Sequence, residues 1–92
     1  MKLGSGGTYT ERAFITNLLS TGYKLAQRTA GSHSAIDIIA INADNQYEGY
    51  QLKRAKRHKY VSVRLSEARR EVGSLPIQIR VYCCEHRKWY EY

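Results

Sequence analysis

Apolar residues recur at two different spacings along the 92-residue chain. Spacing of three and four residues appears in two stretches and predicts helices over residues 8–21 and 62–73. The helical stripes consist of Phe14, Ile15, Leu18 and Leu19, and of Val61, Leu65, Ala68, Val72 and Leu75. Alternating or β-branched runs predict five strands. We expect these strands at residues 23–29, 35–42, 47–54, 77–84 and 88–92.

Turn-forming and capping residues separate these elements. Gly22 should end the first helix, and Gly73 with Pro76 should end the second. Thr8 and Glu11 have the spacing of a capping box, in which Thr8 is the N-cap and Glu11 the third helical residue. The Gly-rich segment 1–7 is expected to be a flexible N-terminal arm.

The order of elements, α-β-β-β-α-β-β, limits the possible folds. The first three strands can form a meander, and the second helix can cross over to a further strand. We therefore expect an α/β (α+β) fold, with a central mixed five-stranded sheet flanked by helices, in a single domain that spans residues 1–92.

Composition narrows the classes of function. The net charge of +7 favours a polyanionic partner, either nucleic acid or an acidic surface. No apolar leader or membrane-spanning stretch is evident, which predicts a soluble intracellular protein. Cys83 and Cys84 are neighbours in a predicted strand and face opposite sides, so we interpret both as packing residues in a reducing compartment.

The candidate chemistry lies between residues 35 and 53. Asp37 stands within a run of isoleucines, where an unpaired carboxylate is costly to bury. A turn or cap role is the alternative for this residue. Gln51 and Lys53 are two residues apart in the next strand and therefore share a face. A carboxylate, an amide oxygen and an ammonium at one edge of a sheet would suit metal-assisted cleavage of a phosphodiester.

Other roles remain open for the neighbouring residues. Glu11 could serve only as a cap, and Gln51 could be a plain polar strand residue. Alternation places Glu48 on the face opposite Gln51, unless a bulge near Gly49 re-aims it. Lys53 could belong simply to the basic run that follows it.

That basic run places five charges within seven residues, at Lys53, Arg54, Lys56, Arg57 and Lys59. It is either a solvated loop or a phosphate-binding surface. On the next helix Glu67 and Glu71 balance the arginines, and we interpret that pattern as a solvent-exposed face. The unbalanced charge thus lies beside the candidate site, which favours phosphate contact.

Several spaced motifs carry a resemblance to a known family. They are Thr10-Glu11-Arg12, Gly22-Tyr23, the segment Arg28 to Ser32, Asp37 among its isoleucines, and Gln51-Leu52-Lys53. Together they resemble the PD-(D/E)xK nuclease superfamily and, more closely, its archaeal Holliday junction resolvases. The resemblance covers nearly the whole chain and implies a Mg²⁺-dependent endonuclease, with Mn²⁺ as a substitute, that acts in DNA recombination and repair.

The resemblance also implies roles for individual residues. Glu11, Asp37 and Gln51 would hold the metal, and Lys53 would be the active-site lysine. The residues implied to contact DNA are Arg12, Arg28, Ser32, His33, Ser34, Arg54, Lys56, Arg57 and Lys59. The protein would be a cytoplasmic homodimer of archaeal or archaeal-virus type that binds a four-way junction or other branched DNA.

One position departs from the family pattern. Gln51 stands where most members have glutamate or aspartate, although members with a Q-x-K pattern, such as the Mrr-like nucleases, are regarded as active. An amide oxygen can ligate Mg²⁺ but carries no charge, so the affinity for the ion should fall. Two alternatives to an active nuclease follow. One is a catalytically weak or inactive relative that binds branched or duplex DNA, and the other is a basic subunit of a larger complex.

Overall fold

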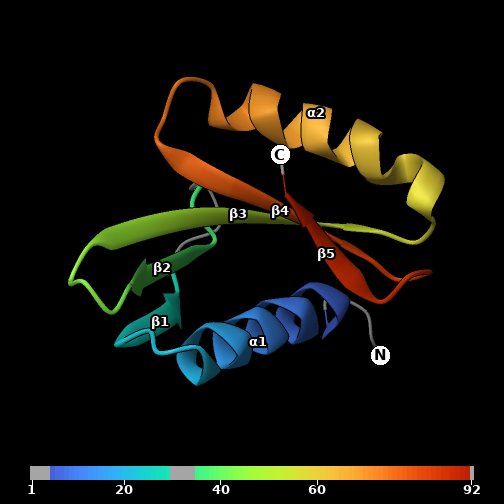
Figure 1. Ribbon diagram of the computed structural model, residues 1–92. Coiled ribbons are helices and arrows are strands. Elements are labelled where there is room, and N and C mark those ends of the chain that lie inside the picture. Colours follow the sequence, from blue (N-terminus) through green and yellow to red (C-terminus); the bar gives the residue numbers. More distant parts are fainter. Residues whose placement is uncertain (1–4, 30–34, 92) are drawn as a thin grey trace.

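The computed structural model of the protein describes residues 5–29 and 35–91. Its helices and strands follow the predicted order α-β-β-β-α-β-β (Figure 1). They are α1 (Ser5–Ser20), β1 (Leu25–Arg28), β2 (Ile38–Ile41), β3 (Tyr47–Ala55), the 3₁₀ turn η1 (His58–Tyr60), α2 (Val61–Val72), β4 (Ile77–Cys83) and β5 (Lys88–Glu91). Neither helix in the described part of the chain has the length and apolarity needed to cross a membrane.

The five strands form one mixed sheet in the order β1-β2-β3-β4-β5. Strands β1, β2 and β3 make an antiparallel meander, and β5 pairs antiparallel with β4. Strands β3 and β4 are parallel, because α2 crosses over between them. Helix α1 covers one face of the sheet and α2 covers the other (Figure 1). The structure thus confirms the predicted sheet with flanking helices.

A hydrophobic cluster fills the space between α1 and the sheet. Its buried members are Phe14, Leu18, Ile38, Ala40 and Tyr50. The ring of Phe14 meets the rings of Tyr50 and Trp89 edge-on, with ring centroids 4.9 Å apart in both pairs. Such aromatic contacts stabilise the packing beyond the area that they bury.

The other face of the sheet packs against α2. Its buried residues come from the end of β3, from alternate positions of β4 and from one side of the helix, namely Ala55, Val61, Ala68, Val72, Ile77, Ile79, Val81 and Cys83. Strand β3 consequently alternates between the two layers, with Tyr50 and Leu52 towards α1 and Ala55 towards α2. Neither cysteine forms a disulfide; Cys83 is buried, as expected of a packing residue, and Cys84 is partly exposed.

Several element boundaries differ from the sequence predictions. Helix α1 begins at Ser5, so Thr8 lies inside the helix and the predicted capping box with Glu11 is wrong. Glycine disfavours a helix by only about 1 kcal/mol per residue, and cooperative extension of an existing helix overcomes this cost. Leu75, placed on the buried stripe of the second helix, lies beyond its end and is 51% exposed.

Strand β2 starts at Ile38, one residue after Asp37, and not at residue 35 as predicted. The reason is local. The hydroxyl of Thr29 donates to the carbonyl of Ile36 (2.6 Å). The Asp37 carboxylate accepts a hydrogen bond from the Leu52 amide, which a backbone carbonyl would accept in a regular strand pair. Regular pairing therefore ends at Ile38, although the Asp37 amide still donates to the carbonyl of Tyr50 in β3.

Glu48 is fixed on the face of the sheet that α1 covers. The hydroxyl of Tyr23 donates to Glu48 Oε1 (2.6 Å), that of Tyr50 donates to the same oxygen, and Asn42 Nδ2 donates to Oε2 (2.9 Å). Pairing runs without a bulge through Gly49, so Glu48 is not re-aimed towards Gln51. Burial opposes ionisation of Glu48, but these hydrogen bonds outweigh it, and the pKa of the carboxyl lies below its ordinary value.

We expect Glu48→Gln to lower the unfolding free energy by about 1–2 kcal/mol at pH 7, because hydrogen bonds to a charged acceptor are lost. The folded state binds fewer protons at this carboxyl than the unfolded state does. The stabilisation is therefore complete above the unfolded pKa near 4.5 and is lost as the pH falls through the lower folded value. Urea denaturation from pH 7 to pH 3 should show the gap between wild type and variant closing in acid.

Glu67→Gln is the matched control, since Glu67 makes a half-exposed ion pair with Arg64 that should contribute little. A gap between wild type and Glu48→Gln that stayed constant across this pH range would contradict the role given to the Glu48 charge.

Candidate active site

Asp37 lies where β2 separates from β3. Its amide donates to the carbonyl of Tyr50 (2.8 Å), and its Oδ2 accepts the amide hydrogen of Leu52 (2.8 Å). The carboxylate therefore occupies the place of a backbone acceptor beside β3. This geometry gives the side chain one orientation and leaves it half-buried between the two strands.

Burial raises the pKa of the Asp37 carboxyl above its ordinary value. The hydrogen bond from Leu52 and the ammonium of Lys53 oppose this shift, and the carboxylates of Glu11 and Glu71 add to it. These charged groups are thus close enough to influence Asp37. Glu11 comes from α1, Lys53 from β3 and Glu71 from α2.

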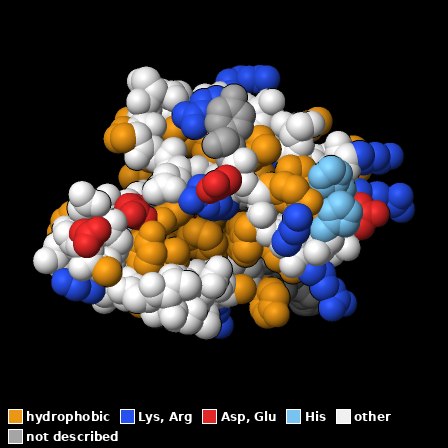
Figure 2. All heavy atoms as spheres, viewed as in Figure 1, with side chains coloured by type: hydrophobic (Ala, Val, Ile, Leu, Met, Phe, Trp, Pro, Cys, Tyr) orange, Lys and Arg blue, Asp and Glu red, His pale blue; other side chains and the backbone are white. Residues whose placement is uncertain are grey.

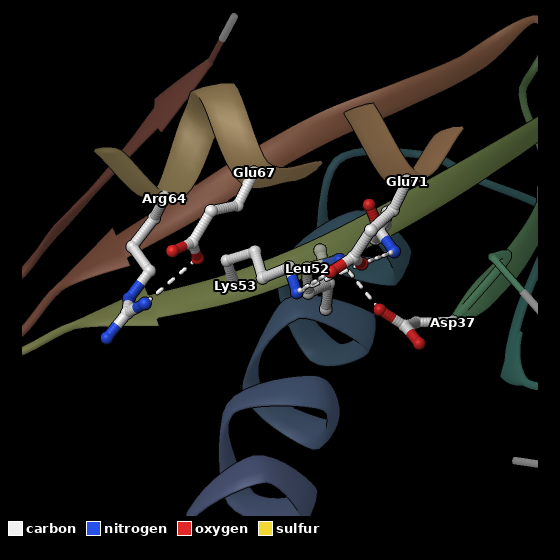
Figure 3. Close-up of polar contacts among 7 residues, drawn as sticks. Asp37, Leu52, Lys53, Arg64, Glu67 and Glu71 are labelled. Atoms are coloured by element: carbon white, nitrogen blue, oxygen red, sulfur yellow. Dashed lines mark hydrogen bonds and ion pairs between the residues drawn. The ribbon is translucent and has the colours of Figure 1, made fainter. Parts of the chain in front are cut away.

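Gln51 and Lys53 share the face of β3 that is turned towards α2, as alternation predicted. Gln51 is only 6% exposed, and its Nε2 donates to Oε1 of Glu71 (2.9 Å). Lys53 Nζ lies 3.1 Å from both carboxylate oxygens of Glu71. Figure 3 shows Glu71 reaching down from α2, and Asp37 from beside β2, to the same stretch of β3.

The other polar atom of the Gln51 side chain is its amide oxygen. This oxygen, Oε1, is buried and accepts no hydrogen bond from any residue that the structure describes. A buried amide oxygen without a donor costs about 1–3 kcal/mol, so such an atom calls for an explanation. A bound cation or a donor on a substrate would supply the missing partner.

Glu71 is a residue that the sequence interpretation missed. The pattern predicted a solvent-exposed face shared with Glu67. The Glu71 side chain is 51% exposed, but its carboxylate contacts Gln51 and Lys53, whereas Glu67 pairs only with Arg64 (2.9 Å) among the contacts described. The hydrogen bond from Lys53 lowers the pKa of the Glu71 carboxyl. One signal in the sequence was its position beside Val72 and three residues after Ala68, which puts it on the border of the buried stripe.

Glu11 lies on α1 and forms an ion pair with Arg28 of β1, whose Nε donates to Glu11 Oε1 (2.7 Å). Glu11 also lines one hollow together with Lys53, as do Thr10, Leu52 and Arg54. A capping role is excluded because α1 begins six residues earlier, at Ser5. Arg28, predicted to contact DNA, forms this ion pair with a side chain that is 47% exposed.

Besides Arg28, the predicted DNA-contacting residues that the structure describes lie in two places. Arg54, Lys56, Arg57 and Lys59 are exposed from the end of β3 into η1, and Arg12 is exposed on α1. Arg54 and Lys56 line a second hollow with Tyr60 and Arg64. Figure 2 shows Lys and Arg side chains at the end of the molecule that holds two stacked histidines, His58 and His86. Ser32, His33 and Ser34 lie outside the described residues.

The oxygen atoms of the site residues determine whether the site could bind Mg²⁺. No cluster of three or more His, Cys, Asp and Glu side chains within residues 5–29 and 35–91 is placed to hold a metal. Mg²⁺ requires less than this, because it binds through one or two carboxylates, with water and substrate phosphates completing its shell. Asp37 and the unpartnered Oε1 of Gln51 fit that requirement.

Comparison with known proteins bears on the fold. No protein-family model and no curated protein matches the chain by sequence. The structure is similar to that of Hjc, a Holliday junction resolvase from the archaeal hyperthermophile Archaeoglobus fulgidus, with a TM-score of 0.56 and 22% sequence identity. The match covers 89% of this chain and 74% of that chain. The chain has the fold of this resolvase. The fold that the sequence resemblance implied is thereby confirmed.

We expect Asp37→Asn to fold with a stability equal to or above that of the wild type at pH 7. The asparagine Oδ1 can still accept the Leu52 amide hydrogen, and the cost of burying a charge disappears. Asp37→Ala leaves that amide without its acceptor and should be less stable than Asp37→Asn by about 1–2 kcal/mol. Chemical denaturation of the three proteins measures both differences, and equal stability of the two variants would contradict the structural role of this hydrogen bond.

Proposed function

We propose that the protein is a divalent-metal-dependent endonuclease that cuts branched DNA, with the four-way junction as its substrate. One observation carries this proposal. The carboxylate of Asp37 and the unpartnered Oε1 of Gln51 stand beside Lys53 at the point where β2 leaves β3, in a fold shared with a Holliday junction resolvase.

Each site residue has a separate role in this proposal. Asp37 anchors the metal, Gln51 Oε1 is a second ligand, and Glu11 completes the set directly or through water. When bound, Mg²⁺ (or Mn²⁺) supplies neutralisation of phosphate charge and activation of a water molecule. Lys53 orients the attacking water or stabilises the negative charge that develops on the phosphate. The Leu52 side chain, between Gln51 and Lys53 in the strand, packs against the cluster on the α1 side of the sheet.

The exposed basic residues of β3 and η1 bind the DNA backbone in this proposal. They are Arg54, Lys56, Arg57 and Lys59, and they follow directly on Lys53 in the sequence. Phosphates held along this run would pass close to the site, because the run continues the strand that carries Gln51 and Lys53. Paired cuts in a junction of two-fold symmetry require two sites, so we propose that the protein acts as a homodimer.

A second candidate is a relative that binds branched or duplex DNA without cutting it. It is favoured by the neutral side chain of Gln51 and by the lack of a three-residue cluster of metal-binding side chains among the described residues. A third, a basic subunit of a larger complex, has no specific observation in its favour. DNA binding that is lost only at high salt would count against it.

Cleavage of a labelled four-way junction should be measured beside cleavage of a linear duplex. Wild type should make paired cuts in the junction with Mg²⁺ or Mn²⁺ and none with EDTA. Asp37→Asn and Lys53→Ala should cut at least about 100-fold more slowly while binding the junction within a few-fold of wild type. Lys24→Ala is the matched control, since Lys24 donates to Asn45 at the β2–β3 turn.

A gel shift without cuts in either metal would support the DNA-binding relative and overturn the nuclease proposal. Full activity of Asp37→Asn would show instead that cleavage arises at another site or from a contaminant.

The basic run predicts a salt effect. Lys56→Ala should weaken binding to junction and duplex alike, and should reduce the slope of log K against log salt by about 1, because one phosphate contact is lost. Electrophoretic mobility shifts between 50 and 300 mM salt measure this slope. An unchanged slope for Lys56→Ala, equal to that of Lys24→Ala, would exclude Lys56 from the DNA interface.

A further inference from the structure

Glu71 is a half-exposed residue of α2 whose carboxylate contacts the sheet. Its side chain is 51% exposed, yet the carboxylate is turned inward to β3, where it contacts both polar residues of the site face. It accepts a hydrogen bond from Gln51 Nε2 at 2.9 Å and lies 3.1 Å from Lys53 Nζ. Figure 3 shows these contacts bridging α2 and β3 above Asp37.

The contact with Glu71 decides which end of the Gln51 amide faces it. An ionised carboxylate only accepts hydrogen bonds, whereas an amide has a donor end and an acceptor end. The NH₂ group must therefore face Glu71, and Oε1 must face away from it. Oε1 is the atom that is buried without a partner among the residues described.

Glu71 also changes the charge at the site. Gln51 brings no negative charge, and Lys53 brings a positive one that would repel a cation. The Glu71 carboxylate offsets Lys53, and it adds a negative charge from α2 to those of Asp37 and Glu11. Without Glu71, the Lys53 ammonium would lose the carboxylate with which it forms an ion pair.

We infer that Glu71 is a positioning residue, which holds the Gln51 amide so that Oε1 faces the metal and supplies from α2 the negative charge that β3 lacks. The inference rests on the proposed metal-dependent function. In the Gln51–Glu71 pair, the amide is on β3 and the negative charge is on α2. Exchanging the two residue types should preserve both the hydrogen bond and the net charge.

The exchange gives a direct test with Mn²⁺ alone as the probe. Isothermal titration calorimetry would compare EDTA-stripped wild type, Glu71→Gln, the double variant Gln51→Glu/Glu71→Gln and the control Glu67→Gln. We expect Glu71→Gln to weaken Mn²⁺ binding about 10- to 100-fold, as is typical when the partner of a metal ligand is lost. The double variant should bind within a few-fold of wild type or more tightly, and Glu67→Gln should bind like wild type.

A purely structural role for Glu71 predicts a different pattern. Glu71→Gln would then lower the melting temperature and leave Mn²⁺ affinity unchanged, and this result would overturn the inference. Failure of the double variant to recover Mn²⁺ binding, in a protein that melts cooperatively, would overturn it as well.

Asp37→Asn separates this inference from the proposed function. Loss of Mn²⁺ binding in Asp37→Asn, together with unchanged binding in Glu71→Gln, would overturn only the role of Glu71. A wild type that binds no Mn²⁺ would overturn the proposed metal-dependent function and the inference with it.

Discussion

The hydrogen bond from the Leu52 amide to the Asp37 carboxylate organises this molecule's candidate site. It ends the pairing of β2 with β3 and holds a half-buried carboxylate against the backbone of the longer strand. Because the side chain replaces a backbone acceptor, its orientation is set by the sheet and not by a flexible loop. Gln51 and Lys53, on either side of Leu52, are thereby brought to the same carboxylate.

The parallel crossover supplies the second part of the arrangement. Antiparallel strands can be joined by short turns, but the parallel pairing of β3 with β4 requires a helix to cross one face of the sheet. Helix α2 buries Ala68 and Val72 against that face, and Glu71 lies beside them at its edge. The same packing that completes the core thus carries a carboxylate to Gln51 and Lys53.

Local patterns explain why much of this could be predicted. Asp37 was identifiable because a carboxylate among isoleucines is costly, and alternation fixed Gln51 and Lys53 on one face. The order of elements followed from periodicity. The mixed sheet followed from that order, because the first three strands can form a meander and the second helix can cross over to a further strand. These inferences depend on residues and elements that are close in sequence.

The features that were missed depend on contacts between distant segments. Glu71 meets Gln51 across 20 residues, and Arg28 meets Glu11 across 17, so neither pairing leaves a local signature. A helix residue on the border of an apolar stripe looks the same in the sequence whether it faces solvent or a buried amide. The start of β2 was misplaced because side chains of Thr29 and Asp37 replaced backbone partners.

A crystal structure of the protein grown with Mn²⁺, with the ion located by its anomalous scattering, tests the central claim most directly. The account predicts an anomalous peak in contact with an Asp37 carboxylate oxygen and with Gln51 Oε1, while Gln51 Nε2 still faces Glu71. A peak away from Asp37, or a Gln51 amide turned with its oxygen towards a protein donor, would contradict it.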